Sequence, residues 1–144
     1  MKCFKGVMHL FFLLVLLAGI SGCADVKNKM ADGVEFNNVG RFADRRGQAN
    51  IVLVTYSGEA AIGNIKQYAE KLGCEMMFAF YYPESTDMDD IPIRQLEEAG
   101  NFGDARELLF KREGVGKWRF ASQCFGLIPT VTDCLESPIS PNCR

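Results

Sequence analysis

The pattern of hydrophobic and polar positions divides the middle of the chain into strands and helices. Residues 51–54 are apolar at every position, and most of 74–83 is apolar too. Because a half-exposed strand would alternate, this predicts two strands that are buried on both faces. Between them, residues 57–73 carry apolar side chains at three- and four-residue steps, with Ser57 placed to cap the helix and Gly73 to end it. This order predicts a βαβ unit with parallel strands and a right-handed crossover.

Two helical segments are expected after the second strand. Residues 93–99 predict a short turn of helix, which Gly100 breaks. A longer helix is expected over 103–113, with Asn101 as its N-cap residue. Together, the short segment and the longer helix form the second helical region of the domain.

The last periodic region predicts a β-hairpin formed by residues 118–124 and 128–134. Apolar and polar side chains alternate in the first of these strands, so one of its faces is expected to be wet. Pro129 cannot donate a ladder hydrogen bond, which places the second strand at a sheet edge. The element order βαβαββ over residues 50–135 predicts a two-layer α/β domain with a small mixed sheet and two helices.

The first 22 residues have the layout of a secretory signal peptide. Lys2 and Lys5 give a basic start, residues 10–17 form an apolar core, and small residues follow. The longer, mostly apolar run from Val7 to Ile20 contains His9 and is shorter than the about 20 residues that a membrane-spanning helix needs. We therefore expect the segment to be cleaved, which removes the only histidine of the chain.

The residues Ile20, Ser21, Gly22 and Cys23 resemble the lipobox of bacterial lipoproteins. The resemblance covers only the first 23 residues, and it implies that the Cys23 thiol receives a diacylglycerol and that the freed amine is acylated, with palmitate as the expected class of chain. The three acyl chains of such an anchor exceed the two membrane-binding signals that stable attachment requires. It implies a cell-envelope protein facing the periplasm, and Ala24 after the cysteine favours the outer over the inner membrane. The alternative is an ordinary cleaved signal with a chance cysteine.

Four cysteines remain after the signal and the lipidated residue: Cys74, Cys124, Cys134 and Cys143. An even number in an exported chain predicts structural disulfides. In the predicted hairpin, Cys124 and Cys134 lie about 20 Å apart along the strands, whereas bridged Cα atoms lie within about 7 Å. A Cys124–Cys134 bridge is therefore excluded. The local choice among the remaining pairings is Cys134–Cys143, which pins the tail 136–144 and leaves Cys74–Cys124 to join the second strand to the hairpin.

Residues 23–49 are polar, with glycines scattered among charges. They predict a flexible tether that holds the domain on the order of 25–30 Å from the bilayer. The mature chain has 14 Lys and Arg against 18 Asp and Glu, a net charge of −4. Because nucleic-acid binding needs a concentrated basic face, no nucleic-acid partner is expected.

Candidate chemistry is sparse. Ser57 lies on a strand-to-helix turn, but the G-x-S-x-G pattern is missing and no histidine is left to act as a base. The residues Glu84, Asp87, Asp89 and Asp90 crowd one loop at a density that can hold calcium, but without EF-hand spacing. The favoured interpretation is a solvated loop whose last aspartate caps the next helix. We therefore expect no enzyme, no cofactor and no metal site.

The order βαβαββ also resembles that of thioredoxin-like and glutaredoxin-like domains, and Gly126–Val131 ("GLIPTV") looks like their Ile-cisPro-Thr turn. The resemblance implies a redox pair between the first strand and the first helix. This chain has Tyr56–Glu59 ("YSGE") there, and Ser57 and Gly58 cannot exchange disulfides. The resemblance therefore implies a thioredoxin-like shape without thiol chemistry.

Tyr56, Tyr82 and Glu84 are the candidate binding residues. They follow the ends of the two predicted parallel strands, and ligands of open α/β sheets bind at that edge. We expect a non-enzymatic envelope lipoprotein that binds an envelope protein, in the setting of a secretion, conjugation or envelope-assembly complex. The alternative is a small solute-binding or thioredoxin-like-shaped domain.

Overall fold

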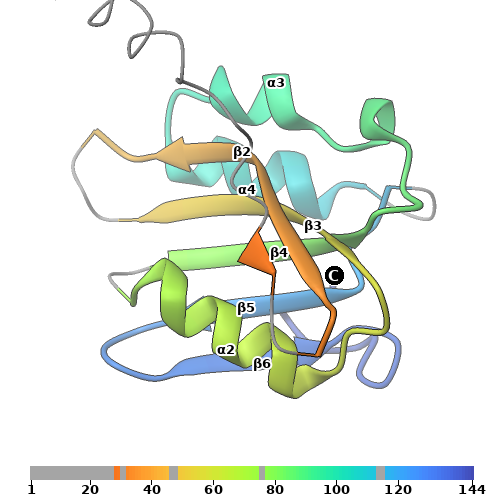
Figure 1. Cartoon of the computed structure of the whole chain (residues 1–144). Coiled ribbons are helices and arrows are strands. Elements are labelled where there is room, and N and C mark those ends of the chain that lie inside the picture. The colour runs from red at the N-terminus through yellow and green to blue at the C-terminus, as the bar shows by residue number, and fades with distance from the viewer. Residues whose placement is uncertain (1–27, 30–31, 46–48, 75–76, 113–115) are drawn as a thin grey trace, which may run out of the picture.

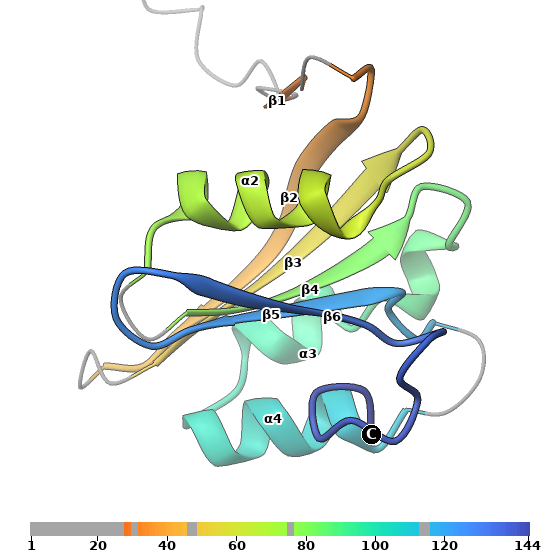
Figure 2. The ribbon, with the colours of Figure 1, turned by 90° about the horizontal axis from the view of Figure 1, so that it is seen from below.

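The computed structural model describes residues 28–29, 32–45, 49–74, 77–112 and 116–144. They form a mixed sheet in the order β1-β2-β3-β4-β5-β6 with helices on both faces (Figures 1 and 2). The strands are β1 (Asn28–Lys29), β2 (Glu35–Ala43), β3 (Asn50–Ser57), β4 (Met77–Pro83), β5 (Phe120–Cys124) and β6 (Pro129–Asp133). The helices are α2 (Ile62–Leu72), α3 (Ile93–Glu97) and α4 (Phe102–Phe110), with a short 3₁₀ segment at Met88–Asp90. The α/β class, the mixed sheet and the disulfide staples are as the sequence predicted.

The predicted βαβ unit is present. β3 and β4 pair in parallel, and α2 connects them. The start of α2 corrects the prediction for Ser57, which ends β3 opposite Glu35 instead of capping the helix. The helix begins after Ala61, whose N–H donates to Asn64 Oδ1 at 2.9 Å. At the other end, Gly73 has a φ of 89° and ends the helix, as predicted.

The assignment of residues 23–49 to a tether is wrong for 35–43, which form β2 antiparallel to β3. The alternation was hidden by a bulge between Asn38 and Gly40. Since a bulge adds one residue to one strand, it moves the following side chains to the other face. Phe36 therefore packs on the α2 side of the sheet and Phe42 on the α4 side, although both have even numbers.

The sheet is covered on both faces, so the domain has three layers and not the expected two. α2 packs on one face, and α3 and α4 pack on the other (Figure 2). The expectation that one face of β5 is exposed to solvent is also wrong. Phe120 contacts the cluster under α2 while Ala121, 1% exposed, contacts the cluster under α4.

The second helical region agrees with prediction in outline. Residues 93–97 form α3, and α4 has Asn101 as its N-cap, with the Asn101 side chain accepting from the Asp104 N–H at 3.0 Å. The expected cap by Asp90 is wrong. Asp87 instead accepts from the Asp89 N–H at the start of the 3₁₀ segment, and α3 follows Pro92 without a side-chain cap.

The hairpin and both disulfides are confirmed. β5 and β6 are antiparallel, and β6 lies at the sheet edge, as Pro129 predicted. The Cα atoms of Cys74 and Cys124 lie 4.9 Å apart, and those of Cys134 and Cys143 lie 5.4 Å apart.

The thioredoxin-like turn is not formed. All peptide bonds of the described residues are trans, and Pro129 begins the last strand opposite Cys124. An edge strand accepts a trans proline as its first residue, since that position needs no ladder donor there. The letters "GLIPTV" are therefore a hairpin turn and the start of an edge strand.

Candidate functional site

The three predicted binding residues do not form one site. Tyr56 pairs in register with Pro83, and Tyr82 pairs with Thr55, so the two tyrosines are offset by one residue and point to opposite faces. Tyr56 joins the cluster under α2, and Tyr82 joins the cluster under α4.

Tyr56 and Glu84 do meet at the sheet end. The Glu84 N–H donates to the Tyr56 carbonyl at 2.7 Å, and both residues line a shallow pocket of about 230 Å³ with Phe36 and Met88. Burial raises the pKa of Tyr56, while the Arg119 guanidinium acts in the opposite direction. Glu84 is exposed, and Glu35, Asn37, Thr55 and Ser57 also line this pocket.

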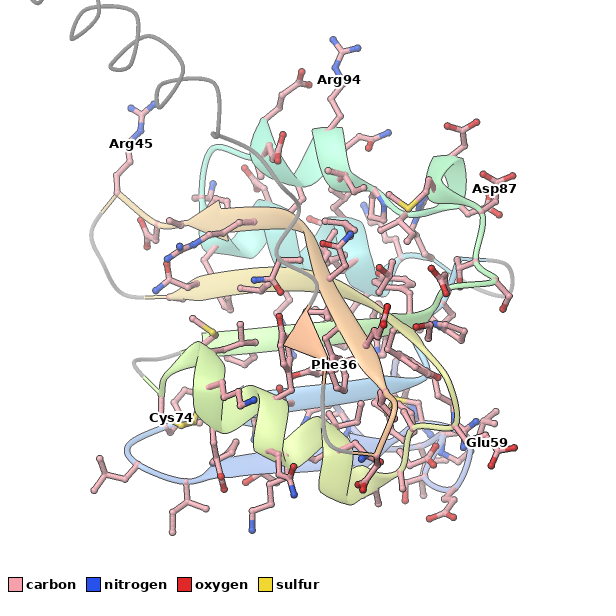
Figure 3. The ribbon with its side chains drawn as sticks, viewed as in Figure 1. Phe36, Arg45, Glu59, Cys74, Asp87 and Arg94 are labelled. Atoms are coloured by element: carbon pink, nitrogen blue, oxygen red, sulfur yellow. A yellow bond between two sulfur atoms is a disulfide. The ribbon has the colours of Figure 1, made fainter. Side chains whose placement is uncertain are left out.

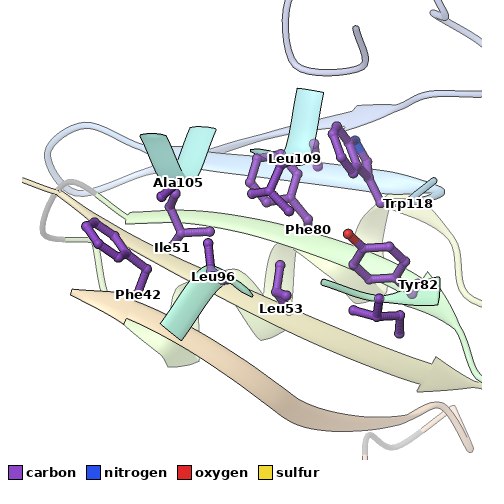
Figure 4. Packing of buried hydrophobic residues seen from close by; sticks show 11 residues of the cluster. Phe42, Ile51, Leu53, Phe80, Tyr82, Leu96, Ala105, Leu109 and Trp118 are labelled. Atoms are coloured by element: carbon purple, nitrogen blue, oxygen red, sulfur yellow. The ribbon is translucent and has the colours of Figure 1, made fainter. Parts of the chain in front are cut away.

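Tyr82 is part of the core. Its side chain has no exposed surface and lies among Leu53, Phe80 and Trp118 (Figure 4). Its hydroxyl is buried without a hydrogen-bond partner. Burial raises the pKa of this hydroxyl, with Arg112 acting in the opposite direction.

The acidic loop presents its carboxylates to solvent. Glu84, Asp87 and Asp89 are exposed, and Figure 3 shows Asp87 pointing away from the domain. Within the described ranges, no three His, Cys, Asp or Glu side chains are arranged to hold a metal ion.

An aromatic pocket beside α4 was missed by the sequence analysis. It has a volume of about 390 Å³. Its walls come from β3, β4, α4, β5 and the C-terminal tail, which Figure 2 shows beside α4. The lining residues are Ile51, Phe78, Phe80, Phe102, Arg106, Phe110, Ala121, Ser122, Gln123, Phe125, Pro141 and Asn142.

The β5–β6 turn carries a second missed feature. Phe125, Leu127 and Ile128, which we call the hairpin tip, are all exposed, and Leu127 is 93% exposed. Leu135 and Ile139 are exposed as well, but they lie in the tail, which follows β6 at the opposite end of the hairpin. Apolar residues in a short turn between strands are unusual, because such turns are ordinarily polar. That anomaly in "FGLIP" was the signal that could have found this surface.

One ion pair ties the base of the hairpin. Arg119 Nε and Nη2 donate to the two carboxylate oxygens of Asp133, each at 3.0 Å. Asp133 is buried, and it also accepts from the Leu135 N–H at 2.9 Å. The hydrogen bond from Arg119 is the main cause that lowers the pKa of Asp133.

Comparisons with known proteins add no relative. The chain matches no family model, and neither the curated proteins nor the solved structures include a significant match. The class that the structure itself defines is a three-layer α/β domain with two disulfides. Cys23 and the lipobox lie outside the described residues, and no helix among the described ones is long and apolar enough to cross a membrane.

Proposed function

We propose that this protein is a lipid-anchored binding module of the bacterial cell envelope that recognises another protein and catalyses no reaction. Its anchor is the acylated Cys23, held in the outer membrane with the domain in the periplasm. Support for export comes from the signal-like residues 1–22 and from two disulfides, which persist in oxidising compartments.

The hairpin tip is the observation that carries the partner proposal. Of the seven large hydrophobic side chains that are exposed in the described residues, Phe125, Leu127 and Ile128 are clustered in the hairpin tip. Soluble domains rarely expose contiguous apolar surface unless it binds a protein or a membrane. The remaining four are Ile62, Met88, Leu135 and Ile139, and the last two follow β6 at the opposite end of the hairpin.

The arrangement of polar groups supports binding over catalysis. Ser57, the hydroxyl that was considered as a nucleophile, ends β3, and the only histidine of the chain lies in the predicted signal. The base that activates a nucleophilic serine is ordinarily a histidine, and the residues that the structure describes contain none.

Site-specific crosslinking in the envelope tests the proposal. A photoreactive residue at position 130, on the exposed part of β6, should capture one protein, identified by mass spectrometry, in the wild type and in Ile62→Glu. Leu127→Glu should abolish that adduct, because it places a charge in the hairpin tip. The Ile62→Glu variant is the matched control, since it adds the same charge to another exposed apolar position.

Two outcomes would overturn the proposal. One is the absence of a Leu127-dependent protein adduct. The other is flotation of the Cys23→Ala chain with phosphatidylethanolamine–phosphatidylglycerol vesicles in a Leu127-dependent manner, which would make the hairpin tip a membrane contact. Labelling with palmitate tests the anchor separately, and Cys23→Ala should lose the label.

A further inference from the structure

We propose that the aromatic pocket beside α4 binds a small organic carboxylate with an apolar chain or ring. This goes beyond the protein partner of the hairpin tip, because it assigns a second, concave site with its own ligand class. The volume of about 390 Å³ lies near the lower end of the range for small-molecule sites.

The apolar part of the ligand is specified by phenylalanine side chains. Phe78 lies between Phe102 and Phe125, with ring centroids 5.3 and 5.5 Å away. Deeper in the pocket, Phe80 and Phe110 meet edge to face at 5.9 Å. Phe78, Phe102 and Phe110 are only half-buried, so a ligand would remove further apolar surface from water.

The charge of the ligand is specified by Arg106. Its guanidinium carbon lies 5.1 Å from the centroid of the Phe110 ring, at the pocket wall. The nearest acidic residues in sequence are engaged elsewhere, since Asp104 accepts from Asn101 and Glu107 pairs with Lys111. Among the described residues, no carboxylate pairs with Arg106. A cation beside an apolar hollow complements an amphipathic anion better than a neutral molecule.

The C-terminal tail forms one wall of the pocket and is held in place by a hydrogen bond and a disulfide. Pro141 and Asn142 line it, and the Trp118 indole Nε1 donates to the Asn142 carbonyl at 3.1 Å. The Cys134–Cys143 bridge closes immediately after them. Gln123 and Asn142, which also line the pocket, are polar residues of the kind that orients a ligand in an otherwise apolar site.

Trp118 provides a direct readout because it is the only tryptophan of the chain. Its ring lies 4.5 Å from Phe80 and 5.3 Å from Phe110, both of which line the pocket. Titration of the mature chain, residues 23–144 with Cys23→Ala, is followed by tryptophan emission and by amide NMR shifts. The probes are octanoate, 3-phenylpropionate and 1-octanol.

We expect saturable binding, with octanoate about 3–5-fold tighter than 1-octanol, the gain of one partly exposed ion pair. Arg106→Gln should remove that preference, whereas Arg94→Gln, an exposed arginine on α3, should keep it. Phe125→Ala should weaken all three probes about tenfold, through lost apolar contact. Leu127→Ala should leave them unchanged, since Leu127 does not line the pocket. The two carboxylates distinguish a chain-shaped from a ring-shaped ligand.

Three results would overturn the proposal. These are the absence of saturable shifts at Gln123 and Asn142, equal binding of octanoate and 1-octanol, or equal effects of Arg106→Gln and Arg94→Gln. Phe125 belongs to both the hairpin tip and the pocket wall, so the residues that separate the two proposals are Leu127 for the protein partner and Arg106 for the ligand. Failure of one proposal therefore leaves the other standing.

Discussion

The two faces of the sheet are packed by different rules. Under α2, aromatic side chains have polar ends that are satisfied: the Tyr68 hydroxyl donates to Asn38 Oδ1 at 2.6 Å, and the Tyr81 hydroxyl lies 3.0 Å from Ser122 Oγ. Under α4, phenylalanines dominate, a pocket remains open, and the Tyr82 hydroxyl has no partner. The α2 side packs its central aromatic rings against one another and leaves pockets only at its edges, beside Tyr56 and beside Leu72, whereas the α4 side leaves half-buried phenylalanines along the aromatic pocket.

Phe36→Ala should have the largest effect on stability. Phe36 is fully buried and stacks on Tyr68, with ring centroids 4.4 Å apart (Figure 3 labels Phe36). Its truncation should cost about 4 kcal/mol of unfolding free energy, as large core deletions do. Phe102→Ala on the α4 side should cost much less, because Phe102 is half-buried at the pocket wall. Urea denaturation measures both. Equal losses of unfolding free energy would mean that Phe36 and Phe102 are equally well packed. A negligible loss for Phe36→Ala would mean that β2 does not contribute to the core through this side chain.

The two disulfides extend the comparison. Cys74–Cys124 joins the end of α2 to β5 and spans 50 residues, whereas Cys134–Cys143 spans 9 residues on the α4 side. The loop-entropy estimate gives about 4 kcal/mol for the first and about 2.7 kcal/mol for the second as upper values. Replacing both cysteines of Cys74–Cys124 with serine should therefore lower the thermal unfolding midpoint more than replacing both cysteines of Cys134–Cys143.

Loss of the tail bridge should also weaken octanoate binding, since Pro141 and Asn142 form a pocket wall. Loss of Cys74–Cys124 should leave ligand affinity of the folded protein nearly unchanged. The reverse pattern would mean that the tail is not part of the ligand site.

Acid should weaken the hairpin through Asp133. Its pKa is lowered in the folded protein by the Arg119 hydrogen bonds, so the unfolded chain binds more protons at low pH. The contribution is therefore present above the unfolded pKa of about 3.9 and is lost as pH falls through the folded value. Asp133→Asn should cost about 1–2 kcal/mol at pH 7, because the exposure of Arg119 limits the pair. Urea midpoints between pH 7 and 2 measure this, and an unchanged acid slope in the variant would contradict it.

Local patterns predicted much of the fold but not its layers. The buried runs of β3 and β4, Gly73, Asn101 and the hairpin follow from residue chemistry, and the hairpin geometry led to the correct disulfide pairs. β2 escaped because its bulge at Asn38–Gly40 breaks the two-residue period.

The site was less predictable, because long-range packing creates it. Tyr56 and Tyr82 end neighbouring strands, but a one-residue offset in register sends them to opposite faces. The aromatic pocket gathers Phe78, Arg106 and Asn142 from distant parts of the chain, and no spacing in the sequence announces that gathering.

Two neighbouring tyrosines on β4 give the smallest and most selective test of the two faces. Tyr81 and Tyr82 are both fully buried, and burial raises the pKa of each hydroxyl. Tyr81→Phe leaves Ser122 Oγ without its partner and should cost about 1 kcal/mol. Tyr82→Phe removes a buried hydroxyl that has no partner, so it should leave stability unchanged or raise it slightly. Paired urea unfolding curves at pH 7 measure the difference. If Tyr82→Phe cost as much as Tyr81→Phe, the Tyr82 hydroxyl would have a partner in solution, and the α4 face would be as well satisfied as the α2 face.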